Sequence, residues 1–231
     1  MTTDTVRAAM LDAAERLLAA STDYDISTRA VCEAVGVTQP VLYRIFGDKQ
    51  GLLDAVADAG MERYAAQKAA LEKTGDPIAD LTAGWDDHMA FARDHPALYQ
   101  LMFTPRPESG AATYRRVLDL LEATLVRCAA VGALTTDPAN AARLILAANV
   151  GVALSQIARP RLFSDPRLSH EARDAVFAAV LTEPSPRGQA DPVRAAARQL
   201  RSQLALSGTT ALEDAEAALL DRWLDRIAAE P

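Results

Sequence analysis

Proline and glycine clusters divide this chain into blocks, and the apolar residues within each block recur at the spacing of an amphipathic helix. No block shows the sustained alternation of β-branched residues typical of a strand, and no repeat recurs at a solenoid period. Alanine, leucine and valine supply most of the apolar residues, and alanine and leucine are strong helix formers. We therefore expect an all-α protein of about ten helices.

The helical blocks can be placed along the chain. The block 139–158 is apolar nearly all round, which predicts a central helix. The proline-rich segment 183–192 is expected to be a loop. Two short helices are expected within 26–46, and the longer ones cover residues 5–20, 50–73, 76–94, 97–103, 109–131, 139–158, 169–181, 191–206 and 211–229.

Composition limits the class of protein. The chain has 231 residues, 50% hydrophobic and 24% charged, which is typical of a soluble globular protein of one or two domains. We expect no secretory signal and no apolar run of the about 20 residues that span a bilayer. Cys32 and Cys128 are far apart in sequence, which fits a reduced, cytoplasmic location. The net charge of −7 excludes nucleic-acid binding by bulk charge, so any such binding needs a local surface.

The segment 26–46 has the features of a helix-turn-helix. Ser27 is expected to cap a first short helix, and Gly36 supplies the left-handed residue of a tight turn. Thr38 is expected to cap a second short helix, with Pro40 in its first turn, where a missing N–H costs nothing. Two short helices joined by such a turn are typical of DNA-binding proteins.

The second helix has two unlike sides. On a helical wheel, one side carries the apolar residues Leu42, Ile45 and Phe46. The other side presents groups suited to base edges and phosphates: Gln39, Pro40, Tyr43 and Arg44. Asp48 is expected to cap the next helix, so that Lys49 and the free N–H groups of its first turn form a phosphate site.

These motifs resemble the DNA-binding domain of the tetracycline-repressor (TetR) family. The resemblance rests on Ala-Ala-Glu-Arg-Leu-Leu at 13–18, Val-Gly-Val at 35–37 and Val-Leu-Tyr-Arg-Ile-Phe-Gly-Asp-Lys-Gln-Gly-Leu-Leu at 41–53. It implies phosphate contacts from Thr38, Tyr43 and Lys49, and base or groove contacts from Gln39, Pro40, Val41 and Arg44. The chain departs from the family at Ile45, where a histidine or an aromatic residue is frequent, and Arg7 is the only base in its N-terminal arm.

The resemblance also implies an organisation and a function. We expect a helix-turn-helix domain over 1–48 and a helical domain for effector binding and dimerisation over 49–231. The expected function is sequence-specific transcriptional regulation, most often repression relieved by a small ligand. Two-fold binding to a palindromic operator implies a homodimer. Its contact is expected from helix 139–158 and from one or both of 191–206 and 211–229.

A ligand cavity is expected among the helices of 76–158, with an uncharged and fairly apolar effector because no lysine or arginine is among the candidates. The alternative that these side chains only fill a core is equally open, and His88 in particular is expected to be a core histidine bonded to a neighbour. Asn149 and Gln156 share a helix face, which suits either an amide bond between helices or a polar contact to ligand. The candidate residues mix aromatic, thioether and a few polar groups: Trp85, His88, Met89, Tyr99, Met102, Phe103, Tyr114, Asn149 and Gln156.

Two other functions remain as alternatives: a helical enzyme, and a helical interaction module without DNA binding. No glycine-rich phosphate loop, GxSxG, HExxH or Cys/His cluster is present, so we expect no enzyme, no metal and no cofactor. A basic stripe of Arg194, Arg198 and Arg201 is expected to pair with nearby acids such as Asp221.

Overall fold

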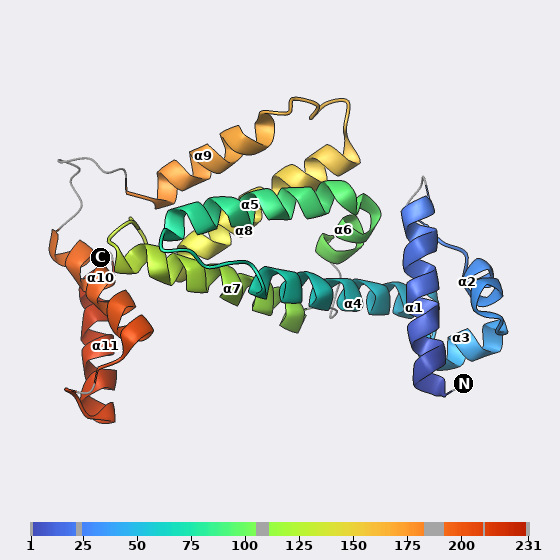
Figure 1. Ribbon diagram of the computed structural model, residues 1–231, viewed down its shortest axis with the longest axis horizontal. Helices are drawn as coiled ribbons and strands as arrows, with labels where there is room; N and C mark the ends of the chain where they lie inside the picture. Colours follow the sequence, from blue (N-terminus) through green and yellow to red (C-terminus); the bar gives the residue numbers. More distant parts are fainter. Residues whose placement is uncertain (1, 22–24, 105–110, 183–191, 210, 230–231) are drawn as a thin grey trace. The chain divides into compact units, whose positions relative to one another are not determined.

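The computed structural model describes residues 2–21, 25–104, 111–182, 192–209 and 211–229. Within these ranges the chain forms eleven α-helices and a single isolated antiparallel bridge, between Leu134 and Leu181 (Figure 1). The helices are α1 Thr3–Ala20, α2 Thr28–Val35, α3 Gln39–Phe46, α4 Lys49–Ala69, α5 Pro77–Asp94, α6 Pro96–Phe103, α7 Ala111–Ala130, α8 Pro138–Ala158, α9 Leu168–Val180, α10 Pro192–Ser207 and α11 Asp214–Ala228.

The all-α prediction is confirmed, and the predicted helices recur within a few residues of their expected ends. Aspartates placed before helices act as caps: Asp48 Oδ1 accepts the Gly51 N–H at 2.8 Å, and Asp137 Oδ1 accepts the Asn140 N–H at 2.9 Å. The largest difference is at the end of α4, which was expected to reach residue 73 and stops at Ala69. The expected loop 183–192 lies almost wholly outside the described residues.

The described chain divides into two compact units. The first comprises Met1–Ala70, His88–Val117 and Ala153–Phe163, and its helices α1, α2, α3, α4 and α6 contact one another. Its buried core includes Met10, Leu18, Val31, Leu42 and Leu52. The predicted domain boundary between 48 and 49 stays a prediction, since α4 begins there and packs against both α1 and α3.

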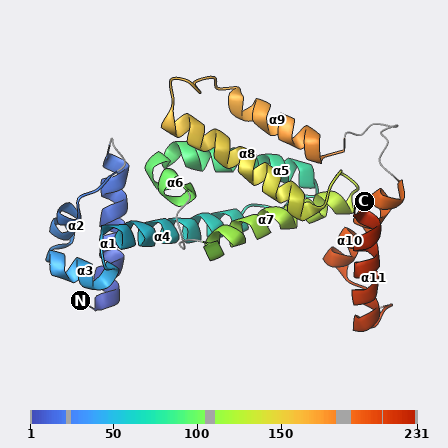
Figure 2. The same ribbon diagram turned by 180° about the vertical axis from the view of Figure 1, so that it is seen from behind.

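The second unit comprises Leu71–Asp87, Leu118–Val152 and Ser164–Pro231. Arg127 on α7 joins its helices by an ion pair with Asp80 on α5, at 2.5 Å. In both views α10 and α11 lie side by side as a helical pair (Figures 1 and 2). Gln199 and Gln203 on α10 both donate to the carbonyl of Ala130 at the end of α7.

Helix α8 bears on the expectation about membrane-spanning runs. An 18-residue window of this 21-residue helix has a mean hydropathy of 1.5, so by length and composition alone this helix could cross a membrane. Arg143, Asn149 and Gln156 interrupt its apolar residues, so it is not the continuous apolar run that the sequence was expected to lack. One such helix is weak evidence, since the core helix of a soluble protein has the same composition.

Candidate DNA-binding surface and effector site

The turn between α2 and α3 has the geometry that its sequence predicts. Ser27 caps α2 by accepting the Ala30 N–H, and Gly36 ends the helix with φ at +73°, in the left-handed region. The Val37 N–H then donates back to the carbonyl of Cys32 at 3.0 Å. This pattern of bonds closes the end of α2 and turns the chain directly into α3.

Thr38 occupies the N-cap position of α3, but its side chain forms no cap hydrogen bond. The expectation that it caps the helix was therefore wrong. Pro40 in the first turn removes one of the N–H groups that a cap would serve, and the helix begins without it. The exposed Thr38 hydroxyl is left at the start of α3, where the resemblance implies a phosphate contact.

The two sides of α3 differ as the wheel predicts. Leu42 is fully buried, while Ile45 and Phe46 are half-buried. The side chains on the other face are exposed, and Tyr43 keeps 44% of its surface accessible. Exposed or half-exposed positions along the helix comprise Thr38, Gln39, Pro40, Val41, Tyr43 and Arg44. Gln39 is partly engaged already, because its Nε2 donates to Thr28 Oγ1 on α2 at 3.4 Å.

Lys49 lies at the first position of α4 and forms an ion pair that the sequence did not predict. Its Nζ lies 2.5 Å from Asp25 Oδ1, and both side chains remain substantially exposed. Hydrogen bonding to Lys49, together with the Ile26 N–H, holds the pKa of Asp25 below its usual value. A DNA phosphate at this position would therefore compete with Asp25 for the ammonium group.

Gly51 is a structural residue of this surface that the sequence analysis missed. A Cβ atom on Gly51 would lie 2.0 Å from the carbonyl oxygen of Phe46, the last residue of α3. Only glycine allows the first turn of α4 to approach α3 so closely. The signal was present as a glycine in the first turn of a predicted helix, where its low helix propensity needs a reason.

The predicted effector residues of the first unit include a buried hydrogen-bonded chain. His88 on α5 is 2% exposed; its Nδ1 lies 2.5 Å from the hydroxyl of Tyr64 on α4, and its Nε2 lies 2.6 Å from the hydroxyl of Tyr99 on α6. Burial lowers the pKa of His88 to about 3, so the ring is neutral. A neutral imidazole has one donor and one acceptor, so one tyrosine donates to the ring and the other accepts from it.

Aromatic rings continue from the buried hydrogen-bonded side chains to the surface of the first unit. Phe103 stacks on Tyr99 with ring centres 4.4 Å apart, and Tyr114 meets Phe103 edge-on at 6.1 Å. Tyr114 is 38% exposed, whereas Tyr99 is fully buried. Met102 is buried, and Met89 and Gln156 are half-buried in the same unit. Tyr64 belongs to this group and was missed, because it was counted only as part of a long helix.

Trp85 and Asn149 belong to the second unit. The Trp85 indole donates to Ser169 Oγ at 3.0 Å and meets Phe177 edge-on, so its contacts are those of a core residue. Asn149 is 4% exposed, and its Oδ1 has no hydrogen-bond partner. No bond from this oxygen to a neighbouring helix is present among the described residues, and the ligand contact of Asn149 stays a prediction.

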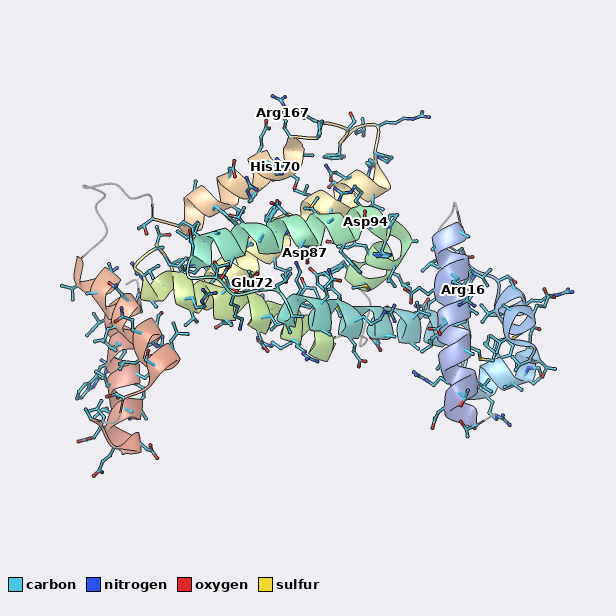
Figure 3. All side chains as sticks on the ribbon, in the orientation of Figure 1. Arg16, Glu72, Asp87, Asp94, Arg167 and His170 are labelled. Carbon is cyan, nitrogen blue, oxygen red and sulfur yellow. The ribbon has the colours of Figure 1, made fainter. Side chains whose placement is uncertain are left out.

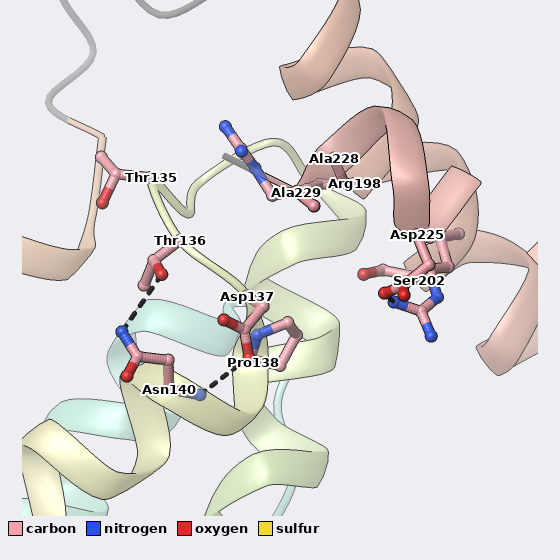
Figure 4. Close-up of a pocket in the computed structure, with 11 residues that line it drawn as sticks. Thr135, Thr136, Asp137, Pro138, Asn140, Arg198, Ser202, Asp225, Ala228 and Ala229 are labelled. Carbon is pink, nitrogen blue, oxygen red and sulfur yellow. Dashed lines mark hydrogen bonds and ion pairs between the residues drawn. The ribbon is translucent and has the colours of Figure 1, made fainter. Parts of the chain in front are cut away.

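One cavity of the second unit, of 370 Å³, lies between the start of α8 and the α10–α11 pair, and none of the nine predicted effector residues lines it (Figure 4). In the described ranges, no three His, Cys, Asp or Glu side chains are grouped to hold a metal ion. His170 on α9, three residues after Arg167, lies 3.9 Å from the carboxylate of Asp86 (Figure 3).

Comparison with solved structures supports the fold. SmeT, described as the repressor of the Stenotrophomonas maltophilia multidrug efflux pump SmeDEF, is 23% identical, with a TM-score of 0.61 over 80% of this chain and 96% of its own. A Rhodococcus sp. RHA1 protein of unknown function is 24% identical, with a TM-score of 0.63 over 77% and 96%. NalD, described as the secondary repressor of the Pseudomonas aeruginosa pump MexAB-OprM, is 17% identical, with a TM-score of 0.56 over 79% and 100%. No curated protein matches the chain in sequence.

Two family models match the chain itself. The model of the bacterial regulatory proteins of the tetR family matches residues 10–56, which include α2, α3 and the start of α4. The model of the tetracyclin repressor-like C-terminal domain matches residues 81–183. Together they cover more than half of the chain, with the DNA-binding model before the C-terminal model. The chain therefore belongs to the tetR family of bacterial regulatory proteins and is a DNA-binding transcriptional regulator.

Proposed function

We propose that this regulator is a cytoplasmic homodimeric repressor, not an enzyme, and that a small, largely apolar ligand releases it from a palindromic operator. The observation that carries the DNA-binding part is the solvent face of α3. Tyr43 and Arg44 are exposed there, next to Lys49 at the positive end of α4. A guanidinium can read guanine in the major groove, and a phenol and an ammonium can hold the backbone.

Release by a ligand is supported by the buried chain Tyr64–His88–Tyr99, which ties α4 to α5 and α6. Helix α4 begins beside α3, so a ligand that displaces this chain would act on the helix that carries Lys49. Such a ligand shifts the equilibrium only by its preference for the displaced state. SmeT, the similar repressor, is also known as a complex with triclosan, at 22% identity to this chain and a TM-score of 0.56 over 80% of this chain and 100% of its own.

The homodimer is supported by apolar faces left open in the second unit. On α8, Leu144 is 44% exposed, and Ala147 and Gly151 on the same helix are exposed. On α11, Trp223 is 52% exposed. Large apolar side chains in contiguous exposed stripes mark protein interfaces. A light-scattering mass of one chain at micromolar concentration would rule out the homodimer.

The test begins with selection of bound sequences from random DNA by the full-length protein. Arg44→Ala is expected to weaken binding to the recovered site by about tenfold to a hundredfold and to relax preference at one base pair. Lys49→Ala should weaken all sequences alike and flatten the salt dependence. Arg93→Ala, which removes an exposed arginine from α5, is the matched control. Equal binding by wild type and Arg44→Ala would refute this docking of α3.

The ligand is then sought by screening apolar compounds for release of the recovered operator. Tyr99→Phe removes the hydroxyl that meets His88 while it keeps the ring that stacks on Phe103. It is expected to change the ligand concentration needed for release without changing operator affinity in the absence of ligand. An unchanged response in both Tyr99→Phe and a Tyr114→Ala variant would place the effector elsewhere.

A further inference from the structure

Gln39 is the exposed side chain of α3 whose polar group is held by another helix. It is the first residue of α3, and its Nε2 donates to Oγ1 of Thr28, the first residue of α2, at 3.4 Å. The bond therefore joins the starts of the two helices that form the helix-turn-helix. Within the described residues, neither the Tyr43 hydroxyl nor the Arg44 guanidinium is held by another side chain in this way.

The backbone around Thr28 places its hydroxyl at a defined position. Ser27 caps α2 immediately before it, and the left-handed Gly36 fixes the turn from α2 into α3. Thr28 is β-branched, so its side chain has few allowed rotamers in a helix. Thr28 is half-buried, whereas Gln39 is exposed, so the better fixed of the two side chains orients the freer one.

The direction of this hydrogen bond decides which edge the Gln39 amide presents to solvent. The amide nitrogen carries two hydrogens, and one of them is used by Thr28. The outward edge then offers Oε1 as an acceptor beside the second N–H. Adenine presents the matching pair in the major groove, the N6 amino donor and the N7 acceptor. Guanine presents two acceptors, O6 and N7, so its O6 would face Oε1 without a hydrogen between them.

We propose that Thr28 is a positioning residue for base recognition, which turns the Gln39 amide so that this residue selects adenine. The proposal rests on the proposed docking of α3, in which residues at the start of the recognition helix reach the base edges. A glutamine that is already oriented loses less side-chain freedom on binding than a free one, so the bond also favours affinity for the correct base. Thr28 acts only through Gln39 and contacts no base itself.

The test measures base preference with the full-length protein and the operator recovered by selection from random DNA. Each base pair of the two half-sites is replaced in turn, and fluorescence anisotropy gives the affinity for each operator. Gln39→Ala identifies the position that Gln39 reads. Thr28→Val keeps the shape of the side chain and removes the hydroxyl, and Thr28→Ser keeps the hydroxyl. Ser27→Ala is the matched control, because it removes a hydroxyl that caps α2 and leaves the Thr28 hydroxyl in place.

At the position identified by Gln39→Ala, the wild type is expected to prefer adenine to guanine by about tenfold or more. Thr28→Val should lower that ratio by about threefold or more, and Thr28→Ser should keep it. Ser27→Ala should weaken binding to all operators alike. Added to Gln39→Ala, the Thr28→Val change should have no further effect on base preference, because its effect passes through Gln39.

The proposal is overturned if the position prefers guanine, or if Thr28→Val leaves the ratio of adenine to guanine unchanged. It is also overturned if Thr28→Val weakens all operators alike, because Thr28 would then hold a phosphate or the fold of α2. These results are distinct from a failure of the docking itself. If Arg44→Ala weakens operator binding while Gln39→Ala changes no base preference, α3 docks as proposed and Gln39 reads no base.

Discussion

The Tyr64 hydroxyl and His88 Nδ1 lie 2.5 Å apart inside the first unit and connect α4 to α5. The ring is uncharged because it is almost completely buried, with Tyr99 at its other nitrogen. Burial lowers the pKa of His88 to about 3 from an ordinary value of 6.5. The free energy of unfolding should therefore depend on pH through His88.

Stability is expected to fall as the pH drops below about 6.5. The unfolded chain then binds a proton at His88 that the folded chain does not, so the free energy of unfolding decreases down to about pH 3, where the loss levels off. The slope is at most about 1.4 kcal/mol per pH unit, which gives about 2 kcal/mol between pH 7 and pH 5. Denaturant unfolding at both pH values measures it.

His88→Gln is the informative variant for this effect. It should be less stable than wild type at pH 7, by about 1–2 kcal/mol, because glutamine cannot bridge both tyrosines with the same geometry. Its loss of stability between pH 7 and pH 5 should be much smaller. His170→Gln, at the exposed histidine of α9, should keep the wild-type pH dependence. An equal pH dependence in wild type and His88→Gln would show that other groups cause it.

The ion pair between Lys49 and Asp25 is expected to lower the affinity for DNA, because Asp25 competes with a phosphate for the Lys49 ammonium group. Asp25→Asn removes the competitor for the Lys49 ammonium group and should raise operator affinity by about twofold to fivefold. The salt dependence of operator binding should also become steeper. Lys49 is then free to neutralise a DNA phosphate and to displace the counterion condensed on it. Fluorescence anisotropy with labelled operator at several salt concentrations measures both quantities.

Asp12→Asn is the control for the Asp25 variant, because it removes the same charge at an exposed position of α1. Its effect should be limited to the small, uniform gain expected of a less negative protein. If the two variants gain equally, Asp25 acts through net charge and not through Lys49.

The sequence predicted most of the fold because its signals are local. The cap at Asp48, the left-handed Gly36 and the apolar side of α3 each depend on residues within one or two turns. The exposed face of α3 followed from the same periodicity. Helix ends and buried helix faces can be predicted from sequence where capping residues and apolar periodicity lie within a few turns of each other.

The candidate sites were predicted less well because they depend on contacts between distant segments. Lys49 and Asp25 are separated by two helices, and Tyr64 meets His88 across 24 residues. Thr38 was assigned a cap from its position, although α3 begins without that bond. Arg198 was expected to pair like Arg201, and nothing in the spacing of the stripe indicated that only one of the two meets an acid.

Gly51→Ala is expected to destabilise the junction of α3 and α4. The new methyl group would lie 2.0 Å from the Phe46 carbonyl oxygen, which is backbone and cannot rotate away. A loss of about 1–3 kcal/mol in the free energy of unfolding, with weaker operator binding, is the expected result. Gly84→Ala on α5 is the control, since its methyl group meets no atom within 4 Å and should be neutral or slightly stabilising. Equal stability of both variants would show that α4 shifts freely at its start.

The exposed face of α11 predicts how two copies meet. Leu219, Trp223 and Ile227 recur every four residues and are 36%, 52% and 44% exposed. Glu216 and Arg226 flank this stripe from opposite ends of the helix. If two α11 helices pair antiparallel about a two-fold axis, Leu219 meets the partner's Trp223, and Glu216 meets the partner's Arg226. The stripe and its charges are therefore self-complementary.

Charge exchange on α11 tests that pairing within one chain. Glu216→Arg alone places two arginines together at each end of the contact, and Arg226→Glu alone places two glutamates together, so each should weaken self-association several-fold. The double variant restores opposite charges and should recover most of the loss, because like charges no longer face each other. Sedimentation velocity over a concentration series measures the association, and circular dichroism confirms that α11 is still helical. Additive losses in the double variant would mean that the two side chains do not meet across the contact, and unchanged association in Trp223→Glu would mean that α11 stays outside it.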